Sequence, residues 1–157
     1  MRIVFICTGN TCRSSMAEAL ARQWLDNNAP AAAGVEVTSA GLAAWSGSPA
    51  SDNAVKVMAA AGIDLTAHRA KPLTGELVRE SDVVLVMTDS HKRAITDNFP
   101  DFAPKVFTLG EFTGSNTDVP DPFGQPVHIY EKCAIKLREL VGNSLHKILK
   151  QAGYAGS

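Results

Sequence analysis

The sequence predicts an α/β fold: a doubly wound, four-stranded parallel sheet with helices on both faces. The first observation behind this prediction is four short, mainly apolar runs, at residues 2–6, 35–38, 83–87 and 105–109. Such runs are typical of strands that are covered on both sides in a parallel sheet. The second observation is that segments with apolar residues at helical spacing alternate with these runs. In folds of this kind, ligands bind where the strands end.

Helices are expected between and after the strands. Apolar residues at helical spacing, capping residues and helix-ending Gly or Pro place them at residues 14–28, 52–61, 74–80, 89–99 and 130–148. Ser14 is the expected N-cap of the first helix. Residues 109–127 are rich in Gly, Pro, Asp and Thr and are expected to form one long loop. A loop of that length in a compact fold is usually functional.

Composition limits the function classes. The 157 residues suit a single domain over residues 1–157, and 15 Lys and Arg against 16 Asp and Glu predict no basic surface for nucleic acid. No apolar run is long enough for a signal-peptide core or a membrane span. The three cysteines, Cys7, Cys12 and Cys133, lack the spacing of a metal site or a disulfide framework. The expected protein is therefore cytoplasmic, with no membrane or nucleic-acid partner and no cofactor or metal.

The segment over residues 7–14, Cys-Thr-Gly-Asn-Thr-Cys-Arg-Ser, connects the first strand to the first helix. Loop amides and the positive end of a helix dipole hold an oxyanion such as phosphate at such a place. Thiols beside arginine or at helix N-termini ionise readily, which makes Cys7 the candidate nucleophile. Arg13 is expected to hold two oxygens of the bound group. Further contacts to that group are expected from Thr8, Gly9, Asn10, Thr11, Cys12 and Ser14.

Two other interpretations of this segment are possible. Cys7 could be a buried structural thiol of the first strand, which is common for cysteine. A Gly-rich nucleotide-binding loop would need Gly-Lys-Ser/Thr at its end, where this chain has Arg13-Ser14. The position of the segment at a strand exit, with Gly9 for a tight turn, favours phosphate-transfer chemistry over both.

The same segment, continued through residues 15–20, resembles the signature of the low-molecular-weight protein tyrosine phosphatase family. The resemblance extends through residues 38–41, His68, residues 86–88 and residues 121–124, so it covers nearly the whole chain. It implies the strand order 2-1-3-4. The chain departs from the family at Ser15, where proline is usual. Because proline pre-organises a first helical turn, its absence is expected to loosen that turn without changing the chemistry.

The resemblance also implies roles for residues outside the signature. Asp121, which precedes Pro122, matches the general acid of the family, and Asp118 is the alternative. Ser39 and His68 are expected to support the loop, His68 by holding the loop rigid rather than by transferring a proton. For Ser39, a solvated turn serine is the other interpretation.

Two aromatic residues are candidates for the walls of the substrate cleft. In the family an aromatic residue near the position of Trp45 can line the cleft. A tryptophan that anchors a loop to the core is the commoner use, so both interpretations of Trp45 stay open. Phe123 follows the expected acid closely and, with Trp45, could flank a flat tyrosine ring.

The sequence thus predicts a cysteine-dependent phosphoprotein phosphatase that forms a phosphocysteine intermediate and acts on phosphotyrosine, phosphoarginine or both. Thr11 favours phosphoarginine, because the loop with Thr11 resembles the bacterial protein-arginine phosphatase branch, whereas eukaryotic tyrosine phosphatases tend to carry a bulky aliphatic residue there. A strict tyrosine phosphatase is the alternative. An arsenate reductase, which would need further relay cysteines, and a non-catalytic phosphate-binding module are disfavoured. The expected partners are phosphorylated proteins and phosphate-like oxyanions, bound by a monomer.

Overall fold

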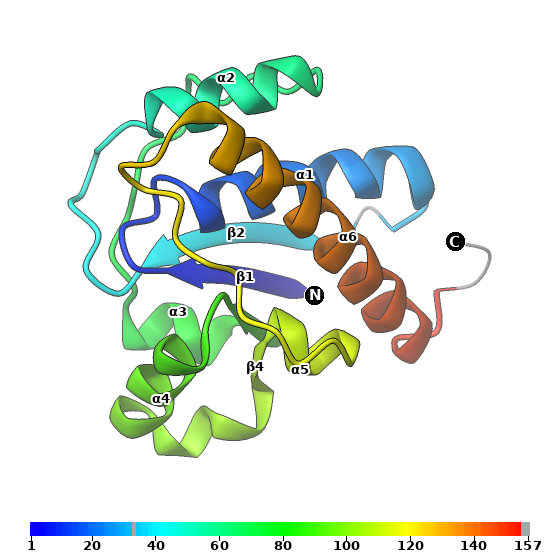
Figure 1. Cartoon of the computed structure of the whole chain (residues 1–157). Coiled ribbons are helices and arrows are strands. Elements are labelled where there is room, and N and C mark those ends of the chain that lie inside the picture. Colours follow the sequence, from blue (N-terminus) through cyan, green and yellow to red (C-terminus); the bar gives the residue numbers. More distant parts are fainter. Residues whose placement is uncertain (33, 155–157) are drawn as a thin grey trace.

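A four-stranded parallel sheet forms the centre of the molecule. The computed structural model describes residues 1–32 and 34–154; residue 33 and residues 155–157 of the expected domain lie outside this description (Figure 1). The strands are β1 (Arg2–Cys7), β2 (Glu36–Gly41), β3 (Val83–Val86) and β4 (Val106–Thr108). They lie side by side in the order β2-β1-β3-β4, and every pair is parallel. The predicted α/β class and the strand order 2-1-3-4 are confirmed.

Helices cover both faces of this sheet. On one face lie α1 (Arg13–Asn28) and α6 (Val127–Gln151), and on the other lie α3 (Gly75–Glu80) and α4 (Asp89–Asn98) (Figure 1). Helix α2 (Asp52–Ala60) packs against α6, and a 3-10 helix, η1 (Pro100–Lys105), follows α4. Each predicted helix is therefore present, with ends within a few residues of those expected.

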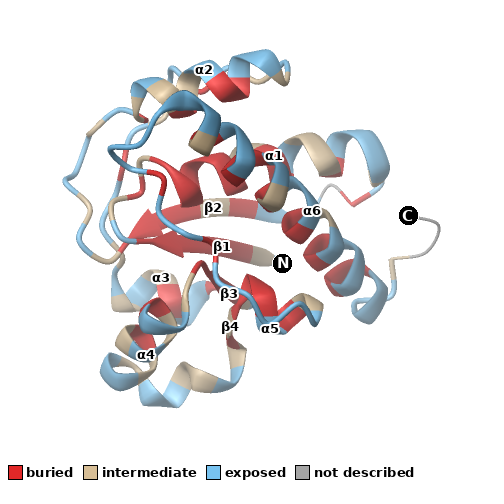
Figure 2. Cartoon of the chain, in the orientation of Figure 1, coloured by how far each residue is buried: buried red, intermediate tan, exposed pale blue. Residues whose placement is uncertain are grey.

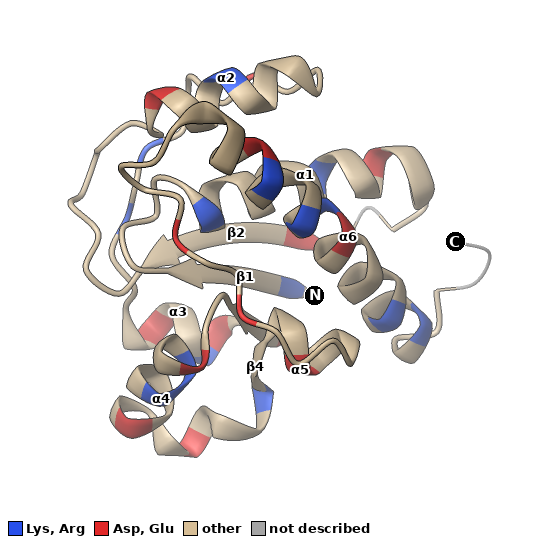
Figure 3. Cartoon of the chain, viewed as in Figure 1, with Lys and Arg blue, Asp and Glu red and all other residues tan. Residues whose placement is uncertain are grey.

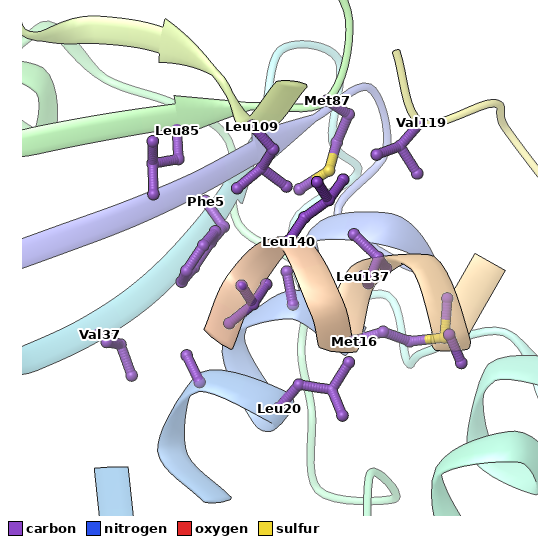
Figure 4. Packing of buried hydrophobic residues seen from close by; sticks show 14 of the residues in the cluster. Phe5, Met16, Leu20, Val37, Leu85, Met87, Leu109, Val119, Leu137 and Leu140 are labelled. Carbon is purple, nitrogen blue, oxygen red and sulfur yellow. The ribbon is translucent and has the colours of Figure 1, made fainter. Parts of the chain in front are cut away.

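The alternation of side chains along β1 explains why its sequence is continuously apolar. Ile3 and Phe5 belong to the larger buried cluster, which includes residues of α1 and α6, whereas Val4 and Ile6 belong to the smaller cluster with residues of α3 and α4. Successive residues of a strand point to opposite faces, and both faces of this sheet are covered. Figure 2 shows the resulting buried centre, and Figure 4 shows Phe5 in the same cluster as Leu137 and Leu140 of α6.

Two local predictions at the carboxyl edge of the sheet are wrong. The second strand was expected over residues 35–38, but β2 continues to Gly41, which pairs with Cys7 of β1. The pairing keeps these backbone groups bonded in a region where Ser39, Ala40 and Gly41 are all buried. Ser14 is not the N-cap of α1 either. Cys12 occupies that position, and Ser14 lies inside the first turn with its side chain directed to Cys7.

The segment expected to be one long loop contains a further helix, α5 (Leu109–Thr113). Its start is a capping box: Thr108 Oγ1 accepts a hydrogen bond from the backbone N–H of Glu111, and the Glu111 carboxylate accepts one from the N–H of Thr108. The Thr-x-x-Glu pattern was therefore a usable signal in the sequence. Residues 114–126 remain irregular and run past the carboxyl edge of the sheet.

Charges of both signs are spread over the surface helices, as Figure 3 shows, in keeping with the formal net charge of −1. In the described part of the chain, none of the helices combines the length and the apolar character needed to span a bilayer.

Candidate active site

The loop over residues 8–12 leaves β1 at the carboxyl edge of the sheet and enters α1. The connection that follows β2 holds it on one side: the N–H of Leu42 donates to Cys7 O (3.0 Å), and the N–H of Ala43 donates to Thr8 O (2.9 Å). On the other side, the N–H of Ser51 donates to Thr11 O (3.0 Å). Backbone contacts with neighbouring segments therefore determine the shape of this loop.

Asn10 turns the loop back on itself. Its φ of 58° lies in the left-handed region, which asparagine tolerates better than most residues. Its side chain is fully buried and makes three hydrogen bonds: Nδ2 donates to Ser14 Oγ (2.8 Å) and to Ser39 Oγ (2.9 Å), and Oδ1 accepts from the N–H of Lys71 (3.1 Å). His68 Nε2 lies 2.6 Å from Asn10 O, so the backbone of the same residue is also held by a hydrogen bond.

Cys7 lies at the floor of a cleft of about 290 Å³ that the loop encloses. Only 2% of the residue is exposed. Its Sγ lies 2.9 Å from Ser14 Oγ and accepts a hydrogen bond from the N–H of Asn10 (3.3 Å). Donors of this kind stabilise a thiolate more than a thiol, so the sulfur is in a setting suited to a nucleophile.

Arg13 forms part of the wall of the cleft and is almost fully buried. Its Nη1 donates to Val119 O (3.0 Å), and its Nη2 lies 3.6 Å from Asp121 Oδ2. Its Nε is buried and has no hydrogen-bond partner among the described residues. A buried donor without a partner is costly, so this N–H is best explained as one that binds a ligand.

The rim of the cleft carries one carboxylate and two aromatic rings. Half of the Asp121 side chain is exposed, and its Oδ1 accepts from the N–H of Phe123 (3.0 Å). Trp45 is 83% exposed and Phe123 is 68% exposed, and both line the cleft. Trp45 therefore does not anchor its loop to the core, and its position in the cleft makes it a candidate wall for a substrate. Asp118 does not line this cleft; its Oδ1 accepts from the N–H of Asp89 (3.2 Å).

Residues 2–153 match the family model described as low molecular weight phosphotyrosine protein phosphatase. The chain belongs to this family. It is 43% identical to a protein-arginine-phosphatase of Bacillus subtilis over 152 residues, which is 96% of this chain and 98% of the relative. It is 45% identical to the probable low molecular weight protein-tyrosine-phosphatase EpsP of Ralstonia solanacearum over 129 residues, 82% of this chain and 83% of the relative.

Solved structures show the same likeness. A C7S mutant of the YwlE arginine phosphatase with a phosphorylated active site serine has 42% sequence identity and a TM-score of 0.89, and the match covers 98% of both chains. Vibrio vulnificus Wzb in complex with benzylphosphonate has 29% identity and a TM-score of 0.83, over 93% of this chain and 97% of that one. The protein is thus a low-molecular-weight protein phosphatase, with relatives that bind oxyanions.

One polar residue beside the loop of this phosphatase was missed from the sequence. His91, in the first turn of α4, is buried, and its Nε2 lies 2.9 Å from Thr8 Oγ1. Burial, with a smaller contribution from the charge of Arg13, lowers the pKa of His91 from 6.5 to about 4, so the imidazole is neutral at pH 7. The sequence did contain a signal for His91, which is its position just after the strand β3. Because the carboxyl ends of parallel strands meet at one edge of the sheet, a residue at that position is expected near the loop that follows β1.

The other two thiols of the phosphatase differ from Cys7 in their surroundings. Cys12 Sγ lies 3.3 Å from both Ser51 Oγ and Tyr130 OH. Burial, followed by the hydrogen bond with Cys12, raises the pKa of Tyr130 to about 12. Cys133 is packed on the buried face of α6, and burial raises its pKa to about 12, as expected of a core thiol. None of the three cysteines, all within the described residues, is in a disulfide.

Cavity volume alone would have favoured a different part of the molecule as the active site. A larger hollow, of about 610 Å³, lies beside β2 and contains none of the loop residues 7–13. The smaller cleft is the candidate active site because a thiol, a buried guanidinium and a carboxylate meet there. Across residues 1–32 and 34–154, no three His, Cys, Asp or Glu side chains are grouped so that they could hold a metal ion.

Proposed function

We propose that this phosphatase acts through a phosphocysteine intermediate. Cys7 Sγ attacks phosphorus as its thiolate and forms the S–P bond while the bond to the leaving oxygen or nitrogen breaks. Asp121 donates its proton to the leaving atom, and the loop and Arg13 hold the phosphoryl oxygens. In the second step the Asp121 carboxylate takes a proton from water as the water oxygen attacks phosphorus, which releases phosphate and the Cys7 thiolate.

One observation carries this proposal: Cys7, Asp121 and Arg13 line one small cleft, and the buried Nε of Arg13 has no hydrogen-bond partner in the described part of the chain. A module that only bound phosphate would need neither the thiol nor the carboxylate. An arsenate reductase would need a relay of cysteines, but Cys133 is packed in the core. We place the reaction in a reducing, cytoplasmic compartment, where a monomer without a cofactor acts on phosphorylated proteins.

For the substrate we propose phosphoarginine, with a strict tyrosine phosphatase as the second candidate. Thr11 lines the cleft and carries a hydroxyl group that could meet the polar N–P leaving group. The relatives include both an arginine phosphatase and a tyrosine phosphatase at similar identity, so identity alone does not choose. Trp45 and Phe123 suit either a guanidinium plane or a phenol ring, since both stack on aromatic faces.

The substitution Thr11→Ile tests the substrate. Leaving a polar leaving group against an apolar wall costs on the order of 1–3 kcal/mol, so kcat/KM on phosphoarginine peptides is expected to fall about tenfold or more. The kcat/KM on phosphotyrosine peptides is expected to remain unchanged or to rise. Both are measured with matched peptides that differ only in the phosphorylated residue.

The matched control is Thr11→Val, which removes the hydroxyl group but keeps the branched shape. A loss with valine equal to that with isoleucine would assign the preference to the hydroxyl, whereas a loss with isoleucine alone would assign it to volume. The arginine proposal is wrong if the parent enzyme prefers tyrosine peptides and Thr11→Ile leaves the ratio of the two kcat/KM values unchanged.

A further inference from the structure

A continuous chain of hydrogen bonds connects the thiol of Cys7 to a carboxylate on the far side of the loop. Ser39 Oγ lies 2.7 Å from Glu18 Oε1, Asn10 Nδ2 lies 2.9 Å from Ser39 Oγ and 2.8 Å from Ser14 Oγ, and Ser14 Oγ lies 2.9 Å from Cys7 Sγ. Glu18 does not line the active-site cleft but a separate hollow beside α1. It therefore has no contact with a substrate in the cleft.

The direction of every hydrogen bond in this series follows from the bond between Ser39 and Glu18. A carboxylate only accepts, so the single hydroxyl hydrogen of Ser39 is donated to Glu18. Ser39 Oγ can then only accept from Asn10, and the second Nδ2 hydrogen of Asn10 is donated to Ser14 Oγ. The hydroxyl hydrogen of Ser14 is left for Cys7 Sγ, where it stabilises the thiolate.

We propose that Glu18 is a positioning residue, which orients this chain so that Ser14 donates its hydrogen to Cys7. The inference rests on the proposed role of Cys7 as the nucleophile. The middle of this hydrogen-bond chain is closed to water, since Asn10 and Ser14 are fully buried and Ser39 is 1% exposed. Water therefore cannot replace a lost donor or acceptor there without a rearrangement.

Glu18 acts by making the flipped orientation of the Asn10 amide unfavourable. The backbone N–H of Lys71 opposes a flip from one end, since it needs Oδ1 as its acceptor (3.1 Å). Glu18 opposes a flip from the other end, because Ser39 has no hydrogen left for an oxygen of Asn10. Without Glu18, only Lys71 opposes the flipped orientation, in which Ser39 and Ser14 both donate to Oδ1 of Asn10 and Cys7 loses the hydrogen of Ser14.

The two oxygens of Glu18 have separate partners, which suits this role. Oε1 accepts from Ser39, while Oε2 lies 3.0 Å from Arg22 Nη2, one turn further along α1. The acceptor for Ser39 is thus held in place by an ion pair on the solvent side. The other titratable or charged groups near the loop and Glu18 are common to the parent and the Glu18 variants. They are His68, which contacts Asn10 O and lines the same hollow as Glu18, and Arg13, Asp121, His91, Cys12 and Cys133.

The test is the pH dependence of Cys7 alkylation by iodoacetamide, followed by mass spectrometry that distinguishes Cys7 from Cys12. A hydrogen bond to a charged group corresponds to roughly one to two pH units, so Glu18→Ala is expected to move the midpoint of the profile up by about one unit. Glu18→Gln keeps an acceptor oxygen for Ser39, and its midpoint is expected to stay close to that of the parent.

The sign of the shift separates this proposal from a simple charge effect. Removal of a negative charge near a thiolate favours the thiolate, so charge alone would lower the midpoint in both Glu18→Ala and Glu18→Gln. A midpoint that is unchanged or lowered in Glu18→Ala overturns the proposal, as does an equal rise in both variants. In a Ser39→Ala background, where the chain is already broken, Glu18→Ala is expected to have little further effect.

Alkylation needs no substrate, so its outcome is independent of the proposed reaction. If Cys7 is not the nucleophile, turnover survives in Cys7→Ser whatever the alkylation profiles show. A purely structural role of Glu18 would instead lower the melting temperature of Glu18→Ala without moving the midpoint, and that result also overturns the proposal.

Discussion

The thiol of Cys7 and the guanidinium of Arg13 have separate tasks in the proposed reaction. The thiol forms the bond to phosphorus, whereas the guanidinium holds oxygens. Arg13 is oriented by Val119 O, and the Nε on its other edge has no partner among the described residues. A planar donor held in this way recognises an oxyanion by geometry as well as by charge, so binding and bond formation should be separable by substitution.

We expect Cys7→Ser to lose turnover of p-nitrophenyl phosphate by on the order of a thousandfold or more, because the nucleophile is removed. Inorganic phosphate should still bind, measured by calorimetry, because the loop and Arg13 remain. The companion variant Arg13→Lys should lose both turnover and phosphate binding, since an ammonium group cannot make the bidentate contact of a guanidinium. Turnover near the parent level in Cys7→Ser would remove Cys7 from the role of nucleophile.

Asp121 and Asp118 are close in sequence but differ in their surroundings. Asp121 lines the cleft and lies 3.6 Å from Arg13, while Asp118 accepts a hydrogen bond from the backbone of α4. Asp121→Asn should therefore slow the release of poor leaving groups far more than that of good ones, because only poor ones need a proton. A series of aryl phosphates checks this slope, with Asp118→Asn as the control. Equal losses across the series, or a steeper slope for Asp118→Asn, would move the acid elsewhere.

At the scale of secondary-structure elements, the carboxyl end of β2 lies directly against the loop. Gly41 pairs with Cys7, and a Cβ atom at this position would lie 2.6 Å from Thr8 O, 2.9 Å from Ala44 Cβ and 3.0 Å from Asn10 N. Two of these neighbours are backbone atoms of the loop, which cannot turn aside as a flexible side chain could. The glycine is therefore required by close approach of the backbone rather than by an unusual φ.

Gly41→Ala should displace the loop. Since displacements on the order of 1 Å can cost about a hundredfold in rate, we expect kcat/KM to fall about tenfold or more and phosphate binding to weaken with it. Gly62→Ala is the control: its φ of 78° makes alanine strained, but a Cβ there meets nothing within 4 Å. It should lower the melting temperature and spare phosphate binding. A Gly41→Ala enzyme that binds phosphate as the parent does would show that the loop can adapt.

For the whole molecule, His91 links stability to pH. Its pKa is lowered from 6.5 to about 4, chiefly by burial. As the pH falls below 6.5 the unfolded chain takes up a proton at this residue, whereas the folded protein does so only near pH 4. The unfolded state therefore binds more protons between these values, so the free energy of unfolding decreases as the pH falls through this window. Above pH 6.5 the stability contributed by the neutral His91 is complete.

His91→Gln should flatten this dependence, because glutamine keeps a polar group beside Thr8 but does not titrate. The measurement is the free energy of unfolding from urea titrations at a series of pH values between 4 and 7. The control is His128→Gln, since His128 is exposed, and it should follow the slope of the parent. A parent-like slope in His91→Gln would mean that other groups produce the pH dependence.

Local signals in the sequence were enough for most of the fold and for the centre of the site. Apolar runs marked β1, β3 and β4 to within one or two residues, because strands covered on both faces admit few polar residues. Cys7 and Arg13 were identified because a loop between a strand and a helix has a recognisable pattern. Helix α5 was missed although its capping box was present, because the many turn-forming residues after it dominated the prediction.

The sequence by itself determined the α/β class, the loop that encloses the cleft and the resemblance to the phosphatase family, because these depend on residues close together along the chain. Only the tertiary structure decided that Trp45 belongs to the cleft, that His91 contacts Thr8, and that Glu18 is bonded through Ser39 to the loop. These contacts join residues from different elements, separated by 83 positions for His91 and Thr8 and by 21 for Ser39 and Glu18. Their existence depends on how strands and helices pack, and on the direction of single hydrogen bonds, neither of which leaves a periodic pattern in the sequence.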